Sequence, residues 1–513
     1  MAIELSNLTF TDEDDIVPVS GIEEIFNTGI ANTLAGNDRI TGDVRYSTSQ
    51  STNGVYNSGT LNTDDGNDII TGIGSLYDSY NQYPEAGIGI YNTIGTIETG
   101  NGNDIITGIG LIRGIQSLSG TINTGDDNDT ITGAATIGRG RSTGVGIWMA
   151  DSTLDTGKGN DVIKGTVLSQ GFGHGLLNEN RSILTTGDGN DIIIGENEHG
   201  GSAISNDGLM DTGNGNDSIT GTNTNNDLDY RASGIYNSKD ITTGDGEDYI
   251  SGTSYGDGII NYGTINTDNG ADNIFGNGRY GYGIINYGTI NTGNGADNIF
   301  GNDGDYSIFN SGSIDTGNGP DFIESSELLY NTGNIFLGEG NDSLASQSGY
   351  NGGIKNYNFI GTGDGNDIIT SSDLIYNEGV IETGNGDDII TGTIYYGIYN
   401  NGGAINMGDG NDSIIADEGF KSGPNSSGAW FLGEGDDYIK GYGSGDFYGG
   451  NGNDTLELTS GTYTVGIWGE EGESPIFTKG DQLMITSEFE KLKAGSTIYD
   501  FTSLTAGQII IVA

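Results

Sequence analysis

Residues 283–301 read GIINYGTINTGNGADNIFG, and residues 258–276 read GIINYGTINTDNGADNIFG, an almost identical stretch that begins 25 residues earlier. The two copies differ only where one has Gly293 and the other has Asp268. Each copy joins short apolar runs to a glycine-rich turn that closes on an aspartate. Self-similarity at this period is typical of solenoid proteins. The repeat is therefore the main evidence for the fold.

An aspartate closes the glycine-rich turn in every copy of the repeat. Seventeen such aspartates follow one another at intervals of 17 to 36 residues. They are Asp38, Asp68, Asp104, Asp129, Asp161, Asp191, Asp217, Asp248, Asp272, Asp297, Asp321, Asp342, Asp367, Asp388, Asp412, Asp437 and Asp454. The residue two positions later is Ile or Leu in all seventeen copies, while the residue between them varies freely. This alternation indicates a strand with one buried face.

Two further positions recur upstream of the aspartate. Glycine stands two residues before it in sixteen copies and four residues before it in fourteen, as a tight turn with positive φ requires. An asparagine recurs thirteen times, mostly eleven residues before the aspartate, and we expect these asparagines to form a hydrogen-bonded column. They are Asn27, Asn57, Asn92, Asn178, Asn206, Asn237, Asn261, Asn286, Asn310, Asn331, Asn356, Asn377 and Asn400. An ordinary turn asparagine is the alternative.

The repeat predicts an all-β fold, a parallel β-helix or β-solenoid of about 17 coils with three short strands per coil. A single coil cannot bury its apolar residues alone, so coils stack about 4.8 Å apart, and seventeen of them give a rod of roughly 80 Å. We expect an N-terminal cap at residues 1–31, the solenoid at 32–431, a short β-roll at 432–458 and a C-terminal β cap at 459–513. Variable inserts fall at one corner, between the aspartate strand and the next asparagine strand.

The composition excludes several classes of partner. The net charge is −55, from 72 acidic and 17 basic residues, so nucleic acid and anionic membranes are not expected to bind. There are no cysteines, which rules out disulfides and thiolate metal sites. No apolar run is long enough to span a membrane, and the N-terminus has no ordinary signal peptide. Cations are the expected partners.

Stacking places one carboxylate per coil in a column. Neighbouring charges about 4.8 Å apart repel by about 3.5 kcal/mol at an effective dielectric constant of about 20, before screening. Protons, backbone N–H donors or cations must offset this repulsion. Calcium fits best among the cations because it accepts six to eight oxygen ligands in loose geometry, including backbone carbonyls. An aspartate that only caps its own turn is the alternative.

Residues 449–457, GGNGNDTLE, match the calcium-binding nonapeptide G-G-x-G-x-D-x-U-x in full. The stretches LGEGDDYIK (432–440) and GYGSGDFYG (441–449) are near matches, so Asp446 joins Asp437 and Asp454 as a candidate ligand. Here the chain resembles the RTX family of calcium-binding repeat proteins. The other turns mostly read T-G-x-G-N-D and occur once per long coil, which departs from that family. The resemblance implies Ca²⁺ at all eighteen aspartates.

The resemblance also implies a cellular location. RTX-like proteins are exported by type I secretion through an uncleaved C-terminal signal, and the glycine repeat stops after Leu458, leaving a distinct C-terminal segment. We therefore expect an extracellular or cell-surface protein whose residues 459–513 serve as cap and secretion signal. The predicted function is a non-catalytic calcium-binding solenoid that acts as a coat, filament, matrix or adhesive component. Its expected partners are calcium, itself or a cell-surface polysaccharide.

Two other functions stay open. A polysaccharide lyase or epimerase would use the few candidate bases and cations, namely Arg139, Arg141, His174, Arg181, Tyr230 and Arg231, which form no recognisable motif. Neither this histidine nor His199 is expected to ligate a metal. An ice-binding protein would use the threonine that stands five residues before the aspartate in thirteen copies. Such threonines also simply suit a strand.

Overall fold

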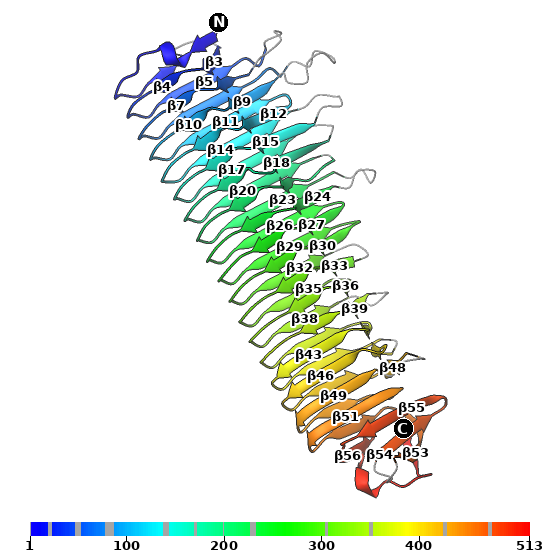
Figure 1. The fold of residues 1–513 in the computed structure, drawn as a ribbon. Coiled ribbons are helices and arrows are strands. Elements are labelled where there is room, and N and C mark those ends of the chain that lie inside the picture. The colour runs from blue at the N-terminus through cyan, green and yellow to red at the C-terminus, as the bar shows by residue number, and fades with distance from the viewer. Residues whose placement is uncertain are drawn as a thin grey trace. The chain divides into compact units, whose positions relative to one another are not determined.

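The computed structural model describes residues 2–18, 23–46, 53–76, 87–136, 143–168, 172–198, 200–225, 232–302, 306–347, 352–394, 396–423, 428–469 and 474–513. The chain divides into two units, Met1–Ile285 and Asn286–Ala513. Each unit is a stack of β coils (Figure 1). The fold class predicted from the sequence is confirmed: the chain is an all-β parallel solenoid with three short strands per coil.

Each coil contributes one strand to each of three parallel sheets, named A, B and C. In the first unit, sheet A contains β1 (Ala2–Glu4), β3 (Glu24–Asn27), β6 (Val55–Asn57), β9 (Ile88–Thr93), β12 (Arg113–Leu118), β15 (Gly144–Ala150), β18 (Gly173–Asn178), β21 (Ile204–Asn206), β24 (Ser233–Asn237) and β27 (Asp257–Asn261). Sheet B contains β2 (Ile16–Val17), β5 (Arg39–Asp43), β8 (Ile69–Ile73), β11 (Ile105–Gly110), β14 (Thr130–Ala135), β17 (Val162–Val167), β20 (Ile192–Asn197), β23 (Ser218–Asn223), β26 (Tyr249–Ser254) and β29 (Asn273–Gly278). Sheet C contains β4 (Ile30–Asn32), β7 (Thr60–Asn62), β10 (Thr96–Glu98), β13 (Thr121–Asn123), β16 (Thr153–Asp155), β19 (Ile183–Thr185), β22 (Leu209–Asp211), β25 (Asp240–Thr242) and β28 (Thr264–Asn266).

The second unit repeats this plan, and β30 (Tyr282–Asn286) contains the division between the units. Its sheet A contains β33 (Tyr306–Asn310), β36 (Leu328–Asn331), β39 (Gly353–Asn356), β42 (Ile375–Asn377), β45 (Ile398–Asn400) and β48 (Phe420–Ser422). Its sheet B contains β32 (Asn298–Asn302), β35 (Phe322–Ser325), β38 (Ser343–Ser346), β41 (Ile368–Ser371), β44 (Ile389–Gly392), β47 (Ser413–Ala416), β50 (Tyr438–Lys440) and β52 (Thr455–Leu458). Its sheet C contains β31 (Thr289–Asn291), β34 (Ser313–Asp315), β37 (Asn334–Phe336), β40 (Phe359–Gly361), β43 (Val380–Asn385), β46 (Ala404–Asp409), β49 (Ala429–Gly435) and β51 (Gly445–Gly452).

The core is built from apolar side chains that stack in register from coil to coil. One coil buries Ile90 from sheet A, Ile97 from sheet C and Ile106 from sheet B, all with no exposed surface. Ile106 lies beside Ile70 of the preceding coil and Ile131 of the following one. Each fully buried isoleucine contributes about 1.5–3 kcal/mol. The Ile or Leu predicted two residues after each aspartate is buried in all seventeen coils.

The turn requires glycine because successive coils approach each other too closely there for a side chain to fit. Gly365, two residues before Asp367, has φ +147°, and a Cβ there would lie 1.3 Å from the carbonyl oxygen of Gly340 in the preceding coil. A side chain at this position would therefore collide with backbone. Four residues before the aspartate, the exceptions Leu34, Asp64 and Asp268 keep the left-handed conformation, with φ of 67°, 60° and 55°.

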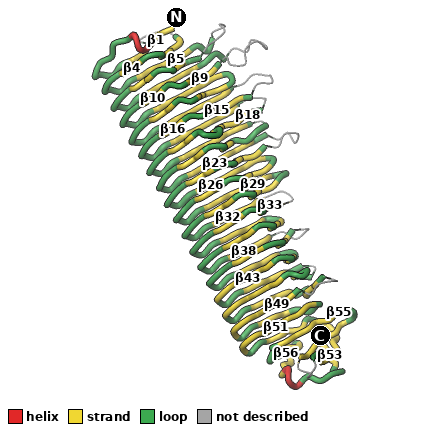
Figure 2. Tube along the Cα trace, in the orientation of Figure 1, coloured by secondary structure: helices red, strands yellow, loops and turns green. Residues whose placement is uncertain are grey.

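Both ends of the chain carry structure that departs from the repeat. At the N-terminus, β1 and β2 pair in parallel with β3 and β5, and the 3-10 helix η1 (Leu5–Asn7) lies between them in the sequence. The C-terminal segment forms an antiparallel cap from β53 (Gly461–Trp468), β54 (Ser474–Lys479), β55 (Gln482–Ser487), β56 (Lys491–Ala494), β57 (Thr497–Asp500), η2 (Phe501–Ser503) and β58 (Ile509–Val512). Strands β55 and β56 pair in parallel with β51 and β52 and so cover the last coil. In Figure 2 the two helical turns stand out in red near the ends of the chain.

The predicted β-roll, residues 432–458, continues the stack in a reduced form. After β49 and β50 the chain returns directly to sheet C as β51, and only an isolated bridge from Gly443 to Phe420 reaches sheet A. This coil therefore has two full strands instead of three, because a spacing of 17 residues from Asp437 to Asp454 is too short to supply a third.

Candidate functional site: the aspartate ladder

The predicted aspartates form a continuous ladder inside each unit. The backbone N–H of each aspartate donates to Oδ1 of the aspartate one coil further on. The distances are 2.7–2.8 Å from Asp38 to Asp272 and 2.7–2.9 Å from Asp297 to Asp454. All seventeen side chains are at most 2% exposed. The carboxyls therefore point along the stack and not toward solvent.

Two residues that the sequence reasoning missed extend the ladder into the ends of the chain. The N–H of Asp15 donates to Oδ1 of Asp38 over 2.8 Å, and the N–H of Asp454 donates to Oε2 of Glu490 over 2.7 Å. Neither Asp15 nor Glu490 lies in a glycine-rich turn, but each stands two residues before a buried apolar residue, Val17 or Leu492, as the repeat aspartates do, and that spacing is the signal that could have found them. Asp446 is placed elsewhere: it lies in β51, half-buried, and the ladder passes directly from Asp437 to Asp454.

The second carboxyl oxygen of the ladder lies next to a threonine. The Thr267 hydroxyl donates to Oδ2 of Asp272 over 2.6 Å. In other coils the hydroxyl turns to a carbonyl of the next coil, as Thr99 does to Thr124 over 3.2 Å, and Oδ2 of Asp104 is then left buried without a donor. Whatever the threonine does, and also in coils without one, Oδ2 is likewise buried without a donor in twelve more ladder aspartates of the described part of the chain: Asp68, Asp129, Asp161, Asp191, Asp217, Asp321, Asp342, Asp367, Asp388, Asp412, Asp437 and Asp454.

Burial raises the pKa of the ladder carboxyls, and the neighbouring aspartates raise it further. The pKa of Asp104 rises to about 7, that of Asp129 to about 8 and that of Asp321 to about 7, mainly because burial penalises the charged form. The hydrogen bond from the Asp68 amide N–H to Asp104 opposes this rise. A proton on Oδ2 would donate to the threonine oxygen, whose own proton donates to the next carbonyl. Every polar atom in the group would then have a partner.

The ladder also bears on the calcium prediction. An orphaned buried Oδ2 needs either a proton or a cation, and threonine hydroxyl and carbonyl oxygens lie beside it. Among the described residues no three acidic or histidine side chains gather in one place, so one or two carboxylates would have to serve each ion together with these oxygens. Four coils have Leu337, Met407, Leu432 or Gly449 in the threonine position and offer fewer oxygens. Calcium at the eighteen aspartates stays a prediction.

The asparagine column is confirmed as a buried ladder. All thirteen side chains are fully buried, and Asn206 illustrates their bonding: it accepts from Asn178 Nδ2 over 2.7 Å and donates to Asn237 Oδ1 over 2.8 Å. Its Nδ2 also donates to the carbonyl of Asp240 over 3.0 Å. Ser117 and Met149 take the asparagine position in two coils and interrupt the column. A second, exposed ladder links the residues that precede the aspartates in many coils, as from Asn216 N–H to Asn190 Oδ1 over 2.8 Å, but Ala271, Ala296 and Pro320 interrupt it.

The residues considered for catalysis are not brought together where the structure describes them. His174 is largely buried, and burial lowers its pKa. Arg181 is exposed and pairs with Asp151 over 3.7 Å. Arg139, Arg141, His199, Tyr230 and Arg231 lie outside the described residues. The thirteen threonines considered for ice binding do not form an exposed face. They lie inside the turn and are at most 1% exposed.

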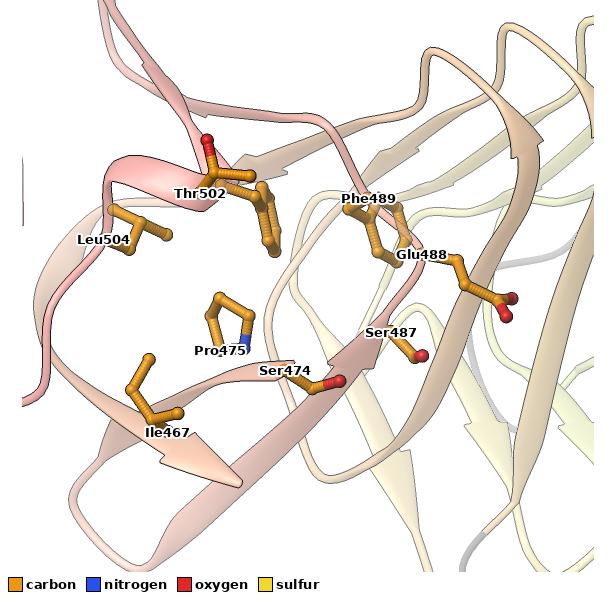
Figure 3. Close-up of a pocket in the computed structure, with 9 residues that line it drawn as sticks. Ile467, Ser474, Pro475, Ser487, Glu488, Phe489, Thr502 and Leu504 are labelled. Carbon is orange, nitrogen blue, oxygen red and sulfur yellow. The ribbon is translucent and has the colours of Figure 1, made fainter. Parts of the chain in front are cut away.

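One pocket lies in the C-terminal cap. It has a volume of about 150 Å³, and its lining is mixed: Ile467, Pro475, Phe489, Phe501 and Leu504 are apolar, and Ser474, Ser487, Glu488 and Thr502 are polar. Figure 3 shows the Glu488 carboxylate pointing away from these side chains. Glu488 has φ +62°, so its backbone is in the left-handed region. The pocket belongs to the packing of the cap and brings no acid–base pair together.

No helix in the described part of the chain is both long and apolar enough to cross a membrane. Neither a protein-family model nor a curated protein matches the chain, so the resemblance to the RTX family stays a prediction.

Proposed function

We propose that this protein is a secreted, non-catalytic structural solenoid of the cell surface or extracellular matrix. The observation that supports this proposal is how the repeat uses its recurrent polar residues. The aspartates, threonines and asparagines of successive coils hydrogen-bond to one another, and they hold the stack together instead of facing a substrate. Repetition of one unit with this bonding yields a long, regular surface, which suits coats, filaments and adhesion.

Calcium binding is part of this proposal. Ions would occupy the turn corner, held by ladder carboxylates, threonine hydroxyls and turn carbonyls, and would neutralise carboxyls that lose their protons at alkaline pH. The test is the melting temperature of the purified protein at pH 8 with calcium and with excess EDTA, together with the metal content of the dialysed protein. EDTA should lower the melting temperature. An unchanged melting temperature and β signal would remove calcium from the proposal.

Export by type I secretion is the other part of the proposal. Residues 459–513 would then carry the uncleaved signal in addition to covering the last coil. Deleting them should abolish export by a type I transporter, whereas an internal deletion of whole coils should not. An exported truncated protein would contradict the assignment of the signal. An assay for lyase products by ultraviolet absorbance, on alginate and pectin, tests the non-catalytic assignment independently.

A further inference from the structure

A continuous row of aromatic rings runs along sheet A in the second unit, with four rings on its strands and two, Tyr287 and Tyr357, directly after its strands. Six consecutive coils contribute one ring each: Tyr287, Phe309, Tyr330, Tyr357, Tyr376 and Tyr399. Successive ring centroids are 5.6, 5.6, 5.0, 5.6 and 5.1 Å apart. This aromatic stripe therefore follows the stacking direction of the coils without interruption.

The four rings on strands face solvent because of the alternation along each strand. In β42, Ile375 and Asn377 are fully buried, so Tyr376 between them must point outward. Tyr287 and Tyr357 are 46% and 36% exposed, and the other four rings are half-buried against their neighbours. The stripe thus presents partly exposed aromatic rings to the solvent along its length.

Pairing of strands alone does not require such a row. Aromatic cross-strand pairs do stabilise sheets, but in the first unit the same register position is occupied by Tyr91, Gln116, Trp148, Leu177, Ser205 and Tyr236 in successive coils. That part of the solenoid folds with mixed side chains at the position. In the second unit Lys355 interrupts this strand position, and the row of rings stays continuous because Tyr357, which follows β39, lies between Tyr330 and Tyr376.

The chemistry of the stripe matches a chain of sugars. The apolar faces of pyranose rings stack on aromatic rings, and a spacing of 5.0–5.6 Å offers about one ring for each sugar of an extended chain. Hydrogen-bonding groups lie at the ring edges: Asn401 Nδ2 is 2.9 Å from the hydroxyl of Tyr376 and 2.7 Å from Oε1 of Glu378. These groups are placed to bond sugar hydroxyls.

The charges decide which class of polysaccharide fits. Lys355 lies in register between Tyr330 and Tyr376, and Nζ of Lys421 lies 4.7 Å from the ring centroid of Tyr399. These two cations outnumber the Glu378 carboxylate, so these three groups carry no net negative charge on a molecule whose net charge is −55. A polyanion would be repelled by the rest of the surface, whereas an uncharged chain would not.

We propose that the aromatic stripe binds an extended, uncharged polysaccharide that lies along the stacking direction of the second unit. The inference rests on the proposed adhesive function and names its partner. One sugar per coil makes the contact multivalent, so affinity should grow with the length of the polysaccharide up to about six sugars.

Affinity gel electrophoresis of the full-length protein tests the proposal. Native gels containing hydroxyethyl cellulose or a soluble β-glucan are compared with gels containing alginate and with plain gels. The uncharged polymers should retard the protein. The triple variant Tyr330→Thr, Tyr357→Thr, Tyr376→Thr should bind at least about tenfold more weakly, since three stacking contacts are lost.

The matched control is the triple variant Tyr56→Thr, Tyr91→Thr, Tyr249→Thr, which removes three outward tyrosines of the first unit and should bind like the natural protein. Circular dichroism and the melting temperature show whether each variant is folded, and threonine suits an outward strand position. The proposal is overturned if the natural protein binds no uncharged polymer, if it binds only alginate, or if both variants bind equally. It is also overturned if sedimentation shows that the stripe variant has lost self-association instead.

Secretion and calcium do not enter this assay, so a negative result leaves the proposed structural role standing. Conversely, cleavage of a polysaccharide in the gel would contradict the non-catalytic role whether or not the stripe binds.

Discussion

The amide N–H of Asp104 donates to Oδ1 of Asp129 in the next coil over 2.8 Å, and Oδ2 of both carboxyls is buried without a donor. One oxygen of each carboxyl is thus bonded by backbone and the other is enclosed. This arrangement suits a neutral carboxylic acid better than a carboxylate. We therefore expect the stability of the protein to depend on pH in an unusual way.

Stability should fall as pH rises from about 4 to about 8. Burial raises the pKa of Asp104 to about 7 and of Asp129 to about 8, above the ordinary value of about 4, so the folded chain binds more protons than the unfolded chain in this range. The ladder's contribution is complete below about pH 4 and is lost as the folded carboxyls ionise. The melting temperature in the presence of EDTA should decrease steadily across the range. A melting temperature that rises with pH would contradict the neutral ladder.

Replacing one rung with its neutral counterpart should remove part of that dependence. Asp129→Asn places an amide donor beside Thr124 and cannot ionise, so it should raise the melting temperature at pH 8 and change it little at pH 4. The matched control is Asp126→Asn, which removes a carboxylate from the exposed part of the same turn. The control should not alter the pH dependence, and equal effects of the two variants would argue against the ladder.

A buried asparagine should be costly to lose. Asn206→Leu removes the acceptor of Asn178 and both donor bonds of Asn206, which leaves buried polar groups unpaired, so we expect about 2–3 kcal/mol less stability. Urea unfolding followed by circular dichroism measures the loss. Asn216→Ala cuts the exposed ladder instead and should cost less than about 0.5 kcal/mol. A small effect at Asn206 would mean that the column is not a structural element.

A left-handed leucine offers a stabilising substitution. Leu34 has φ 67° at the turn position that is glycine in most coils, a conformation that costs a residue with a Cβ about 1–2 kcal/mol. Leu34→Gly should therefore raise the melting temperature, even though glycine gives the unfolded chain more freedom. Leu34→Ala keeps the Cβ and should give no gain. If alanine stabilises as much as glycine, the backbone is not the source of the effect.

Removal of the C-terminal cap should cause self-association. Strands β51 and β52 pair with β55 and β56, so deleting residues 459–513 exposes two open strand edges. Light scattering after size-exclusion chromatography should show oligomers or aggregates of the truncated protein. Glu490→Gln retains the cap and an acceptor for the N–H of Asp454, and it should elute like the natural protein. A monomeric truncated protein would show that the edge is protected in another way.

The sequence predicted the architecture well because each coil repeats the same constraints. Ile106, Asp104 and Asn92 recur at fixed offsets, and such recurrence reveals burial without an alignment. The direction in which a carboxyl points is not encoded in this way. The spacing of the aspartates along the sequence would be the same whether Asp104 pointed outward from the turn or inward into the ladder. For that reason the sequence predicted a metal site at the aspartates, whereas the structure shows hydrogen bonds between the aspartates of successive coils. Glu490 ends the ladder from outside the repeat, and only the fold brings it to Asp454.

The inward ladder also changes how the protein should behave as an electrolyte. The formal charge of −55 assumes that all 72 acidic side chains are ionised. Carboxyls such as Asp104, Asp129 and Asp321, with pKa values of about 7, 8 and 7, keep a large share of their protons at neutral pH. The buried carboxyls should therefore bind and release protons near pH 7, where free aspartate has almost no buffering capacity. Electrophoretic mobility at pH 7 should accordingly correspond to a charge smaller in magnitude than the sequence implies.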